Sequence, residues 1–381
     1  MKTQAEASSD ALSFVTNSDP AVGSIARTSD AHIAELDGIR AFAIWSVLVV
    51  HLFFVWPTTE QGRAFIPKAL ALVLSHGWLG VDLFFVLSGF LITRILFATK
   101  RLGRGTYFRR FYTRRVLRIL PLCLVVIAVL LVAFRGHYAT YFAYCALMSA
   151  NLAPPGTPIP DAGGPFWSLA VEEQYYLVWP WLVLWLDGRR LMIAAVSLII
   201  IELFARMFTS SEGVYHTLFR LDGLAMGSFL AIWFSSWNGD RRVARNLALI
   251  LLGAALTIAI AGLPFGIRYA TFPNTTISQA ICVFGAVMVF VIAYSGHRAF
   301  AILRTPIFTT TALLSYALYL VHRPVVDGLV ALFGNAAWYV QLSPVHATLL
   351  RAAVVLPLAY AVAMLTRRFI ELPCIRLGRG K

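Results

Sequence analysis

A histidine lies in the first long apolar run of the chain, and an arginine precedes it by eleven residues, as Arg40 and His51. Eleven residues at about 100° each complete three helical turns to within about 20°. The two side chains are therefore predicted to share one helix face, about 16 Å apart along the axis. An imidazole in such a place is suited to general-base chemistry near neutral pH. A simpler interpretation is that Arg40 anchors the helix end and His51 bonds a neighbouring carbonyl.

The second apolar run carries a carboxylate, Asp82, and a Ser88-Gly89 pair. An ionisable residue inside an apolar run is costly to bury, so Asp82 is a candidate to orient a histidine or to bind a cation. Ser88 lacks the GxSxG context of a serine nucleophile. We interpret Ser88 as a residue that bonds across helices, next to a glycine that permits close helix contact.

Two arginines, Arg115 and Arg118, open the third apolar run. Three residues apart on a helix, their side chains share a face. Paired guanidinium groups suit the bidentate recognition of phosphate. A basic cluster at a membrane boundary explains the same residues equally well.

Two adjacent acids, Glu172 and Glu173, follow Ser168 at the start of a later run. Ser168 is predicted to be the N-cap of that helix, which places both acids in its early turns. They are candidate catalytic residues. Arg220 and Asp222 open a further run and are candidates for acceptor binding or for a structural polar role.

His322 and Arg323 lie in another run and precede Pro324. A proline inside a helix removes a hydrogen bond and tends to break the helix. We therefore expect a break there, with His322 and Arg323 facing a cavity. His322 joins Ser88, Arg220 and Asp222 as a polar residue for acceptor binding or structure.

The elements that carry these residues are predicted from composition. The chain has 381 residues, 59% of them hydrophobic and 13% charged, whereas about 25% charged residues is usual in soluble domains. This excludes a single soluble domain, a disordered chain and a disulfide-stapled module. The fold class is therefore all-α, a polytopic membrane helical bundle of about ten transmembrane helices. The expected spans are 39–56, 78–97, 116–134, 167–187, 190–208, 217–235, 247–264, 277–294, 306–333 and 347–366.

Three regions are expected along the chain. Residues 1–35 form a flexible cytoplasmic tail with no signal peptide. Residues 36–370 form the transmembrane domain, with a loop and a short interfacial or re-entrant helix at 135–166. Residues 371–381 form a short basic cytoplasmic tail.

The formal net charge is +14. Twenty-three of the 32 basic residues fall in segments that ten spans would place inside, which predicts that both termini are cytoplasmic. Topology thus explains most of the charge, and no nucleic acid partner is expected. The four cysteines have no CxxC spacing, so neither a disulfide nor a zinc site is expected.

Together these motifs resemble the acyltransferase-3 family of integral membrane O-acyltransferases. The similarity runs from about residue 33 to residue 377, in the order of the family. The segments that carry it are 36–41 with His51, 80–90, 114–121, 167–176, 220–227 and 315–324.

The resemblance implies that His51 is the essential catalytic histidine and that Arg40 pairs with it. It implies acyl-CoA, usually acetyl-CoA, as a co-substrate, with no permanently bound cofactor and no metal. The acceptor would be a hydroxyl of a surface polysaccharide, lipopolysaccharide, lipo-oligosaccharide or other glycolipid, or alternatively of a macrolide. The location would be the bacterial inner membrane, among its lipids. Many relatives carry a fused esterase-like domain, which we do not find in this chain, and this disfavours the peptidoglycan branch.

The resulting hypothesis places the CoA phosphates on Arg115 and Arg118, with help from Arg40. His51 would deprotonate the acceptor hydroxyl, or would instead carry the acetyl group itself. Asp82 or the acids Glu172 and Glu173 would orient His51 or bind sugar hydroxyls. Two other classes, a secondary transporter and a non-catalytic scaffold, remain as alternatives. Substrate uptake into liposomes distinguishes the first, and a buried histidine in register with Arg40 speaks against the second.

Overall fold

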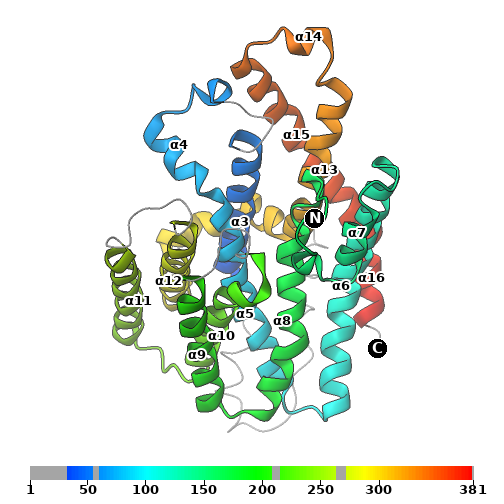
Figure 1. Cartoon of the computed structure of the whole chain (residues 1–381). Helices are drawn as coiled ribbons and strands as arrows, with labels where there is room; N and C mark the ends of the chain where they lie inside the picture. Colours follow the sequence, from blue (N-terminus) through cyan, green and yellow to red (C-terminus); the bar gives the residue numbers. More distant parts are fainter. Residues whose placement is uncertain (1–31, 55–59, 208–214, 263–271, 380–381) are drawn as a thin grey trace.

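The computed structural model describes residues 32–54, 60–207, 215–262 and 272–379. Within these ranges every regular element is a helix, which confirms the predicted all-α class (Figure 1). The predicted flexible tail, residues 1–35, lies almost wholly outside the described residues. Its last two residues, Ala34 and Glu35, already belong to the first described helix.

The long helices follow the ten predicted spans, with shifted ends. The predicted span 217–235 begins later than expected, because its helix starts at Asp222. The predicted span 116–134 begins earlier, because the basic stretch before it is also helical from Arg104. These helices are α3 (Ala34–Phe53), α5 (Gly80–Thr99), α6 (Arg104–Ala133), α8 (Phe166–Trp185), α9 (Gly188–Met207), α10 (Asp222–Ser235), α11 (Arg241–Gly262), α12 (Phe272–Ala293), α13 (Pro306–Phe333) and α15 (Pro344–Thr366).

Six segments of the described chain are long and apolar enough to cross a membrane. A helical membrane bundle is thus established, while the count of ten spans stays a prediction. Helix α10, with 14 residues, is about 21 Å long and shorter than the roughly 30 Å apolar core of a bilayer. Most of its residues are buried, and it packs against α5 and α9. The six segments are Ala34–Phe53, Lys68–Thr99, Arg104–Ala133, Thr276–Ala293, Pro306–Phe333 and Pro344–Gly378.

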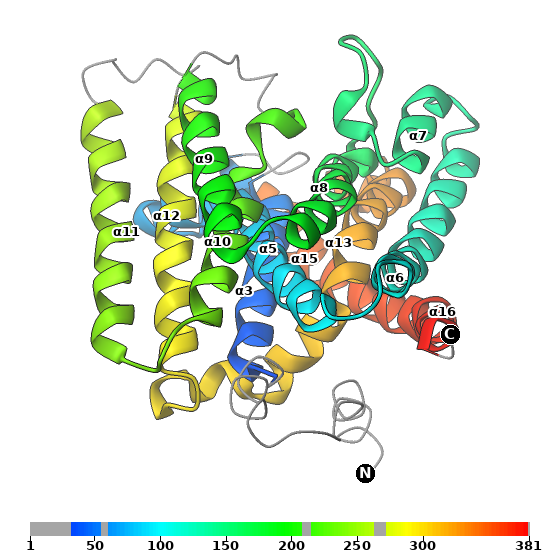
Figure 2. The same ribbon diagram turned by 90° about the horizontal axis from the view of Figure 1, so that it is seen from below.

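Helices α3 and α5 lie between two apolar clusters and contribute to both. The larger cluster joins them to α6, α8 and α13, and the smaller joins them to α10, α11 and α12. Figure 2 shows α11 and α12 side by side at one edge and α6 with α16 (Leu372–Arg379) at the other. Burial on both sides therefore fixes the positions of α3 and α5, which carry Arg40, His51, Asp82 and Ser88.

Close packing of α5 on α10 depends on two glycines. A Cβ atom at Gly89 would overlap the carbonyl oxygen of Leu224, and one at Gly227 would overlap that of Val86. Each helix thus supplies a glycine where the backbone of the other approaches. The predicted role of Gly89 in close helix contact is confirmed.

The predicted helix break at Pro324 is wrong, because α13 runs without interruption from Pro306 to Phe333. A proline inside a helix costs about 3 kcal/mol or more. Packing of α13 against α3 and α15 outweighs this cost. His322 and Arg323 are buried rather than facing a cavity, with exposed fractions of 1% and 2%.

Short helices lie between and after the long ones. Residues 135–166 contain α7 (Ala139–Ala146), a helix too short to cross a membrane, in the segment predicted as a loop with a short helix. The segments α4 (Lys68–Ser75) and α14 (Ala337–Val340) lie at the upper end of the bundle in Figure 1. The residues predicted to form a basic C-terminal tail build α16, which packs against α6.

Candidate active site

A cavity of about 200 Å³ lies among α3, α5, α6, α8 and α13. Five predicted site residues line this cavity together: Arg40, Ser88, Arg115, Arg118 and Glu172. The rest of its wall is formed by Val81, Phe84, Phe85, Leu91, Ile92, Ile95, Ile119, Ser168, Leu169, Tyr176, Ser315, Tyr316 and Tyr319. Residues far apart in the sequence therefore form one cationic, aromatic pocket.

The arginines of α6 face this cavity, as their spacing predicts. The Arg115 guanidinium lies 5.2 Å from the centre of the Tyr176 ring, a cation–π contact that orients it. The Tyr176 hydroxyl donates a hydrogen bond of 2.5 Å to Glu172 Oε1. Three arginines and one glutamate line the cavity, and this excess of positive charge favours an anionic ligand.

The surroundings of Arg40 contain a carboxylate, Asp37, on the same helix. Arg40 Nη1 lies 3.6 Å from Asp37 Oδ1. His32 Nε2, outside the membrane-spanning segment, lies 2.8 Å from Asp37 Oδ2, and this hydrogen bond raises the pKa of His32. Asp37 therefore orients Arg40 while His32 shares the same carboxylate.

Hydroxyl groups connect the helices at one wall of the cavity. Tyr319 Oη of α13 lies 2.5 Å from Ser168 Oγ of α8, and Tyr316 donates to the carbonyl of Ile119. The predicted N-cap role of Ser168 is wrong: α8 begins at Phe166, and Ser168 donates to the carbonyl of Pro165 from inside the helix. Its early position in α8 instead lets the hydroxyl reach α13.

Sequence reasoning did not assign the three cavity residues of α13. Ser315, Tyr316 and Tyr319 all line the cavity, and their spacings of one, three and four residues put them on one side of a helix. This spacing is the signal that could have identified them.

The two histidines His51 and His322 lie side by side. Their ring centroids are 4.9 Å apart, with the ring planes inclined at 60°. His51 Nδ1 bonds the carbonyl of Val47 at 2.8 Å. Arg40 lines the cavity together with residues of α13, and His51 contacts His322 of α13, so Arg40 and His51 face the same neighbour as their spacing predicts.

The hypothesis that Asp82 orients His51 is wrong. Asp82 Oδ1 lies 3.2 Å from an Nη atom of Arg220, and both residues are at least 97% buried, with exposed fractions of 1% and 3%. Arg220 also stacks over Trp167 at 4.8 Å. A buried carboxylate needs a charged partner, and Arg220, which precedes α10, is closer than any histidine in the described contacts.

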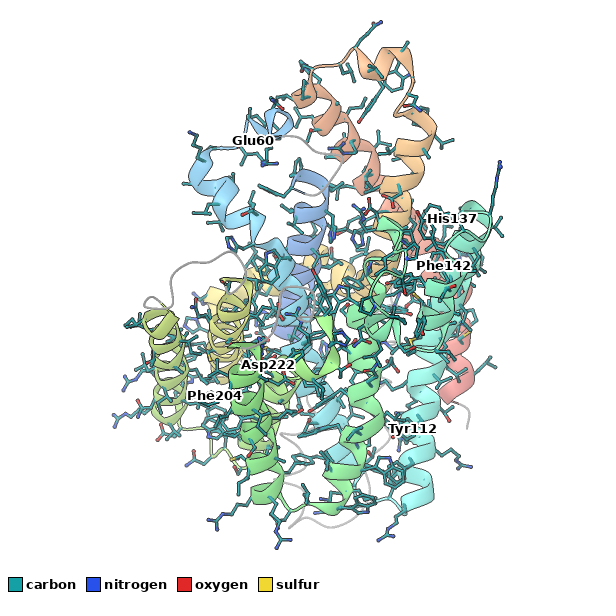
Figure 3. The ribbon with its side chains drawn as sticks, viewed as in Figure 1. Glu60, Tyr112, His137, Phe142, Phe204 and Asp222 are labelled. Carbon is teal, nitrogen blue, oxygen red and sulfur yellow. The ribbon has the colours of Figure 1, made fainter. Side chains whose placement is uncertain are left out.

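Asp222, which is labelled in Figure 3, belongs to the same buried charge network. It pairs with Arg206 of α9. Glu202, also on α9, lies 3.8 Å from Arg206 and accepts hydrogen bonds from the backbone N–H groups of Leu221 and Asp222. Glu202 thus caps α10 from another helix, a role the sequence analysis missed. This network fixes α5, α9 and α10 relative to one another, so Arg220 and Asp222 have a structural place in the fold.

The predicted acids of α8 are separated by the structure. Glu172 lines the cavity, whereas Glu173 does not. Glu173 Oε1 is buried without a hydrogen-bond partner in the described part of the chain. Neither carboxylate contacts His51 in the described structure, so their predicted role in orienting His51 is not supported.

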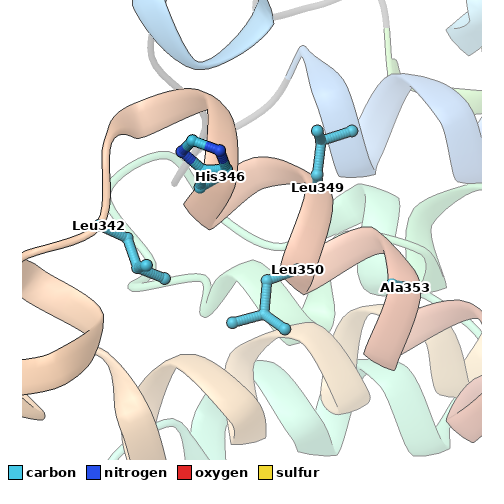
Figure 4. A pocket seen from close by; sticks show the side chains of 5 residues that line it. All are labelled: Leu342, His346, Leu349, Leu350 and Ala353. Carbon is cyan, nitrogen blue, oxygen red and sulfur yellow. The ribbon is translucent and has the colours of Figure 1, made fainter.

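A larger, shallow hollow of about 570 Å³ lies elsewhere, at the start of α15 (Figure 4). Three leucines, one alanine and one exposed histidine line this hollow: Leu342, His346, Leu349, Leu350 and Ala353. His346 bonds the local Ser343 hydroxyl at 2.7 Å. No predicted site residue lines this hollow.

The fold and the site define a class: a helical membrane protein with a cationic cavity and a pair of adjacent histidines, one buried and one half-buried. A family model described as an acyltransferase domain matches residues 33–368. This match covers most of the chain, and the chain belongs to that acyltransferase family.

Several curated proteins are similar to this chain. The peptidoglycan O-acetyltransferase OatA of Listeria monocytogenes is 26% identical over 92% of this chain and 57% of its own length. The putative peptidoglycan O-acetyltransferase YrhL of Bacillus subtilis is 28% identical over 77% of this chain and 49% of its own. The O-acetyltransferase OatA of Staphylococcus aureus is 24% identical over 92% and 58%. The chain thus spans about half the length of these relatives, and no solved structure matches it.

Proposed function

We propose that this protein is a membrane O-acetyltransferase that moves an acetyl group from acetyl-CoA to a hydroxyl of a carbohydrate. The observation that carries the proposal is one cavity that brings Arg40, Arg115 and Arg118 together. The His51–His322 pair does not line this cavity, but the ring of Tyr319, which does, is centred 6.0 Å from the ring of His322. Membership of the acyltransferase family and the names of the relatives support it.

The arginine-lined cavity supports an acyl-CoA donor. Guanidinium groups bind phosphate with paired, charge-assisted hydrogen bonds, and Arg115 and Arg118 project from one face of α6 into the cavity. At about 200 Å³ the cavity suits the narrow acyl-pantetheine arm rather than the whole nucleotide. The adenosine part would then lie outside, with its phosphates on the arginines.

His51 would act as the general base. A carbonyl oxygen can only accept hydrogen bonds, so the contact with Val47 requires the proton on His51 Nδ1. The lone pair of His51 is therefore on Nε2. It takes the proton of the acceptor hydroxyl while that oxygen bonds to the thioester carbonyl carbon. The carbon–sulfur bond then breaks, and the CoA thiolate takes up the proton. General-base catalysis of this kind contributes about 10²–10⁴-fold.

The names of the relatives support peptidoglycan as the first acceptor to test. They weigh against the expectation that the peptidoglycan branch is disfavoured. A hydroxyl of another surface glycan, a glycolipid or a macrolide is the alternative within the same chemistry.

We further propose that the protein lies in the bacterial inner membrane with both termini in the cytoplasm. The positive charge of the predicted inner segments supports this topology. Contacts among those segments agree with it: Glu35 lies 3.4 Å from Arg304, and Lys100 Nζ donates to the carbonyl of Leu186 at 2.9 Å. Segments assigned to the same side thus meet in the fold.

The test is the ester-linked acetate on surface glycans of cells that produce the chain or its His51→Ala variant. Acetate is measured by mass spectrometry of purified peptidoglycan and of the other glycans. We expect the wild type to add acetyl esters and the variant, at equal membrane level, to add none detectable. Unchanged glycans with the wild type, or full acetylation with His51→Ala, would refute the proposal.

A further inference from the structure

The two histidines of the site are held in the same way. His322 Nδ1 lies 3.0 Å from the carbonyl oxygen of Leu318 and 2.9 Å from that of Tyr319. As with His51 and Val47, an oxygen that only accepts places the proton on Nδ1. Both rings therefore present an unprotonated Nε2. Two lone pairs of the same kind lie on neighbouring rings, at a ring separation of 4.9 Å.

The Nε2 atom of His322 is a buried acceptor that lacks a donor. It has no hydrogen-bond partner among the described residues, and the side chain is 1% exposed. Buried polar atoms in folded proteins nearly always have a partner, and one without a partner calls for an explanation. The adjacent Arg323 does not supply it, because its guanidinium points to Asp161 at 3.3 Å and Asp327 at 3.5 Å.

A metal site does not explain the pair. Structural and catalytic zinc sites use at least three protein ligands. In the described ranges, no group of three or more His, Cys, Asp or Glu side chains could hold a metal ion. A hydrogen-bond donor to His322 Nε2 is therefore expected to form during the reaction itself.

We propose that His322 shares the proton that His51 takes up during acetyl transfer. This inference rests on the proposed function. When His51 Nε2 removes the proton of the acceptor hydroxyl, its new N–H donates to the unpaired Nε2 of His322. When the carbon–sulfur bond breaks, the proton passes to the CoA thiolate, and both rings return to their neutral form. His322 acts through His51 and is thus a positioning residue.

The surroundings favour such sharing. Leu52 follows His51 in sequence and Val326 lies one turn beyond His322, and both belong to a small apolar cluster with Val355. An imidazolium in apolar surroundings has little water to stabilise it, so a hydrogen bond from it is worth more than in water. Among the described residues, His322 lies beside His51 with an unpartnered Nε2 that can accept that bond.

The test compares three substitutions at one position. Glutamine places its amide oxygen near the position of Nε2, whereas asparagine places its polar atoms near Nδ1. The assay is CoA thiol release from acetyl-CoA by the full chain in detergent micelles, with an N-acetylglucosamine oligomer as acceptor probe. We expect His322→Ala and His322→Asn to lower kcat about 10- to 100-fold, with KM for acetyl-CoA unchanged. His322→Gln should stay within a few-fold of wild type.

A double variant separates sharing from an independent role. If His322 works through His51, then His51→Ala/His322→Ala loses no more activity than His51→Ala alone. His346→Ala, at the distant hollow, is the matched histidine control and should leave kcat unchanged.

Three results would overturn the inference alone: a wild-type kcat in His322→Ala, more activity in His322→Asn than in His322→Gln, or multiplied losses in the double variant. If His51→Ala keeps full activity, or the wild type acetylates no glycan, the proposed function fails and this inference with it.

Discussion

The hydroxyl of Tyr319 lies 2.5 Å from the hydroxyl of Ser168, and this bond joins α13 to α8 across the wall of the cavity. Ser168 donates its own proton to the carbonyl of Pro165 at 3.1 Å, so Tyr319 is the donor in the pair. The Tyr319 ring is centred 6.0 Å from the ring of His322. One side chain therefore contacts both the cavity and the histidine pair.

Removal of that hydroxyl should weaken both stability and activity. Tyr319→Phe loses one buried hydrogen bond, at a cost of about 1 kcal/mol, and should lower the thermal midpoint in micelles by a few degrees. We also expect kcat to fall several-fold, because the wall next to His322 loosens. Circular dichroism melts and thiol release measure the two effects. Unchanged values for both would contradict this account of the Tyr319–Ser168 bond.

Loss of an arginine from the cavity should weaken donor binding. Arg118→Ala removes charge-assisted bonds worth about 1.5–3 kcal/mol, so KM for acetyl-CoA should rise about tenfold or more while kcat changes little. Arg110→Ala, an exposed arginine of α6 outside the cavity, is the matched control. If both variants raise KM equally, general surface charge rather than the cavity binds the donor.

The glycine contact between α5 and α10 should tolerate no side chain. Gly89→Ala forces a methyl group against the carbonyl of Leu224, and overpacking of this kind costs about 1–3 kcal/mol. Gly253→Ala in α11 meets nothing within 4 Å and should be neutral or stabilising by up to about 1 kcal/mol. Thermal midpoints of the purified variants compare the two. Equal midpoints would show that α5 and α10 do not pack this closely.

The buried Asp82–Arg220 pair should show strong coupling. Asp82→Asn leaves the Arg220 charge buried without its partner, which costs about 3–5 kcal/mol. Replacement of both residues, as Asp82→Asn/Arg220→Met, removes the buried charge and should restore most of the lost stability. The stability of each variant is measured as the fraction of protein that still elutes as the folded species in size-exclusion chromatography after mild heating. A double variant less stable than Asp82→Asn would argue against the pair as the source of the effect.

Several features followed from local sequence alone. Helical periodicity placed Arg40 and His51 on one face and Arg115 and Arg118 on another, and the structure confirms both because each depends on a single helix. The role of Gly89 was also predictable, since a glycine within an apolar helix favours a close neighbour. The predictions for Ser168 and Pro324 were wrong, because packing against other helices outweighs a capping preference of about 1 kcal/mol and a helix-breaking cost of about 3 kcal/mol.

Partners across helices could not be predicted. The bond of Asp82 to Arg220, the cap that Glu202 provides for α10, and the contact of His51 with His322 all join residues far apart in the chain. Each depends on how far two helices are rotated and shifted relative to one another. Hydrophobicity, which is non-directional, leaves that rotation and shift open.

The sequence by itself determined that this protein is an all-helical membrane bundle and predicted candidate residues for its chemistry, because composition and the 3.6-residue period are local properties. Only the tertiary structure decided which of those residues meet. Arg40, Arg115 and Arg118 come together in one cavity and His51 meets His322 because α3 and α5 are buried between two apolar clusters. The close packing of many side chains sets that arrangement.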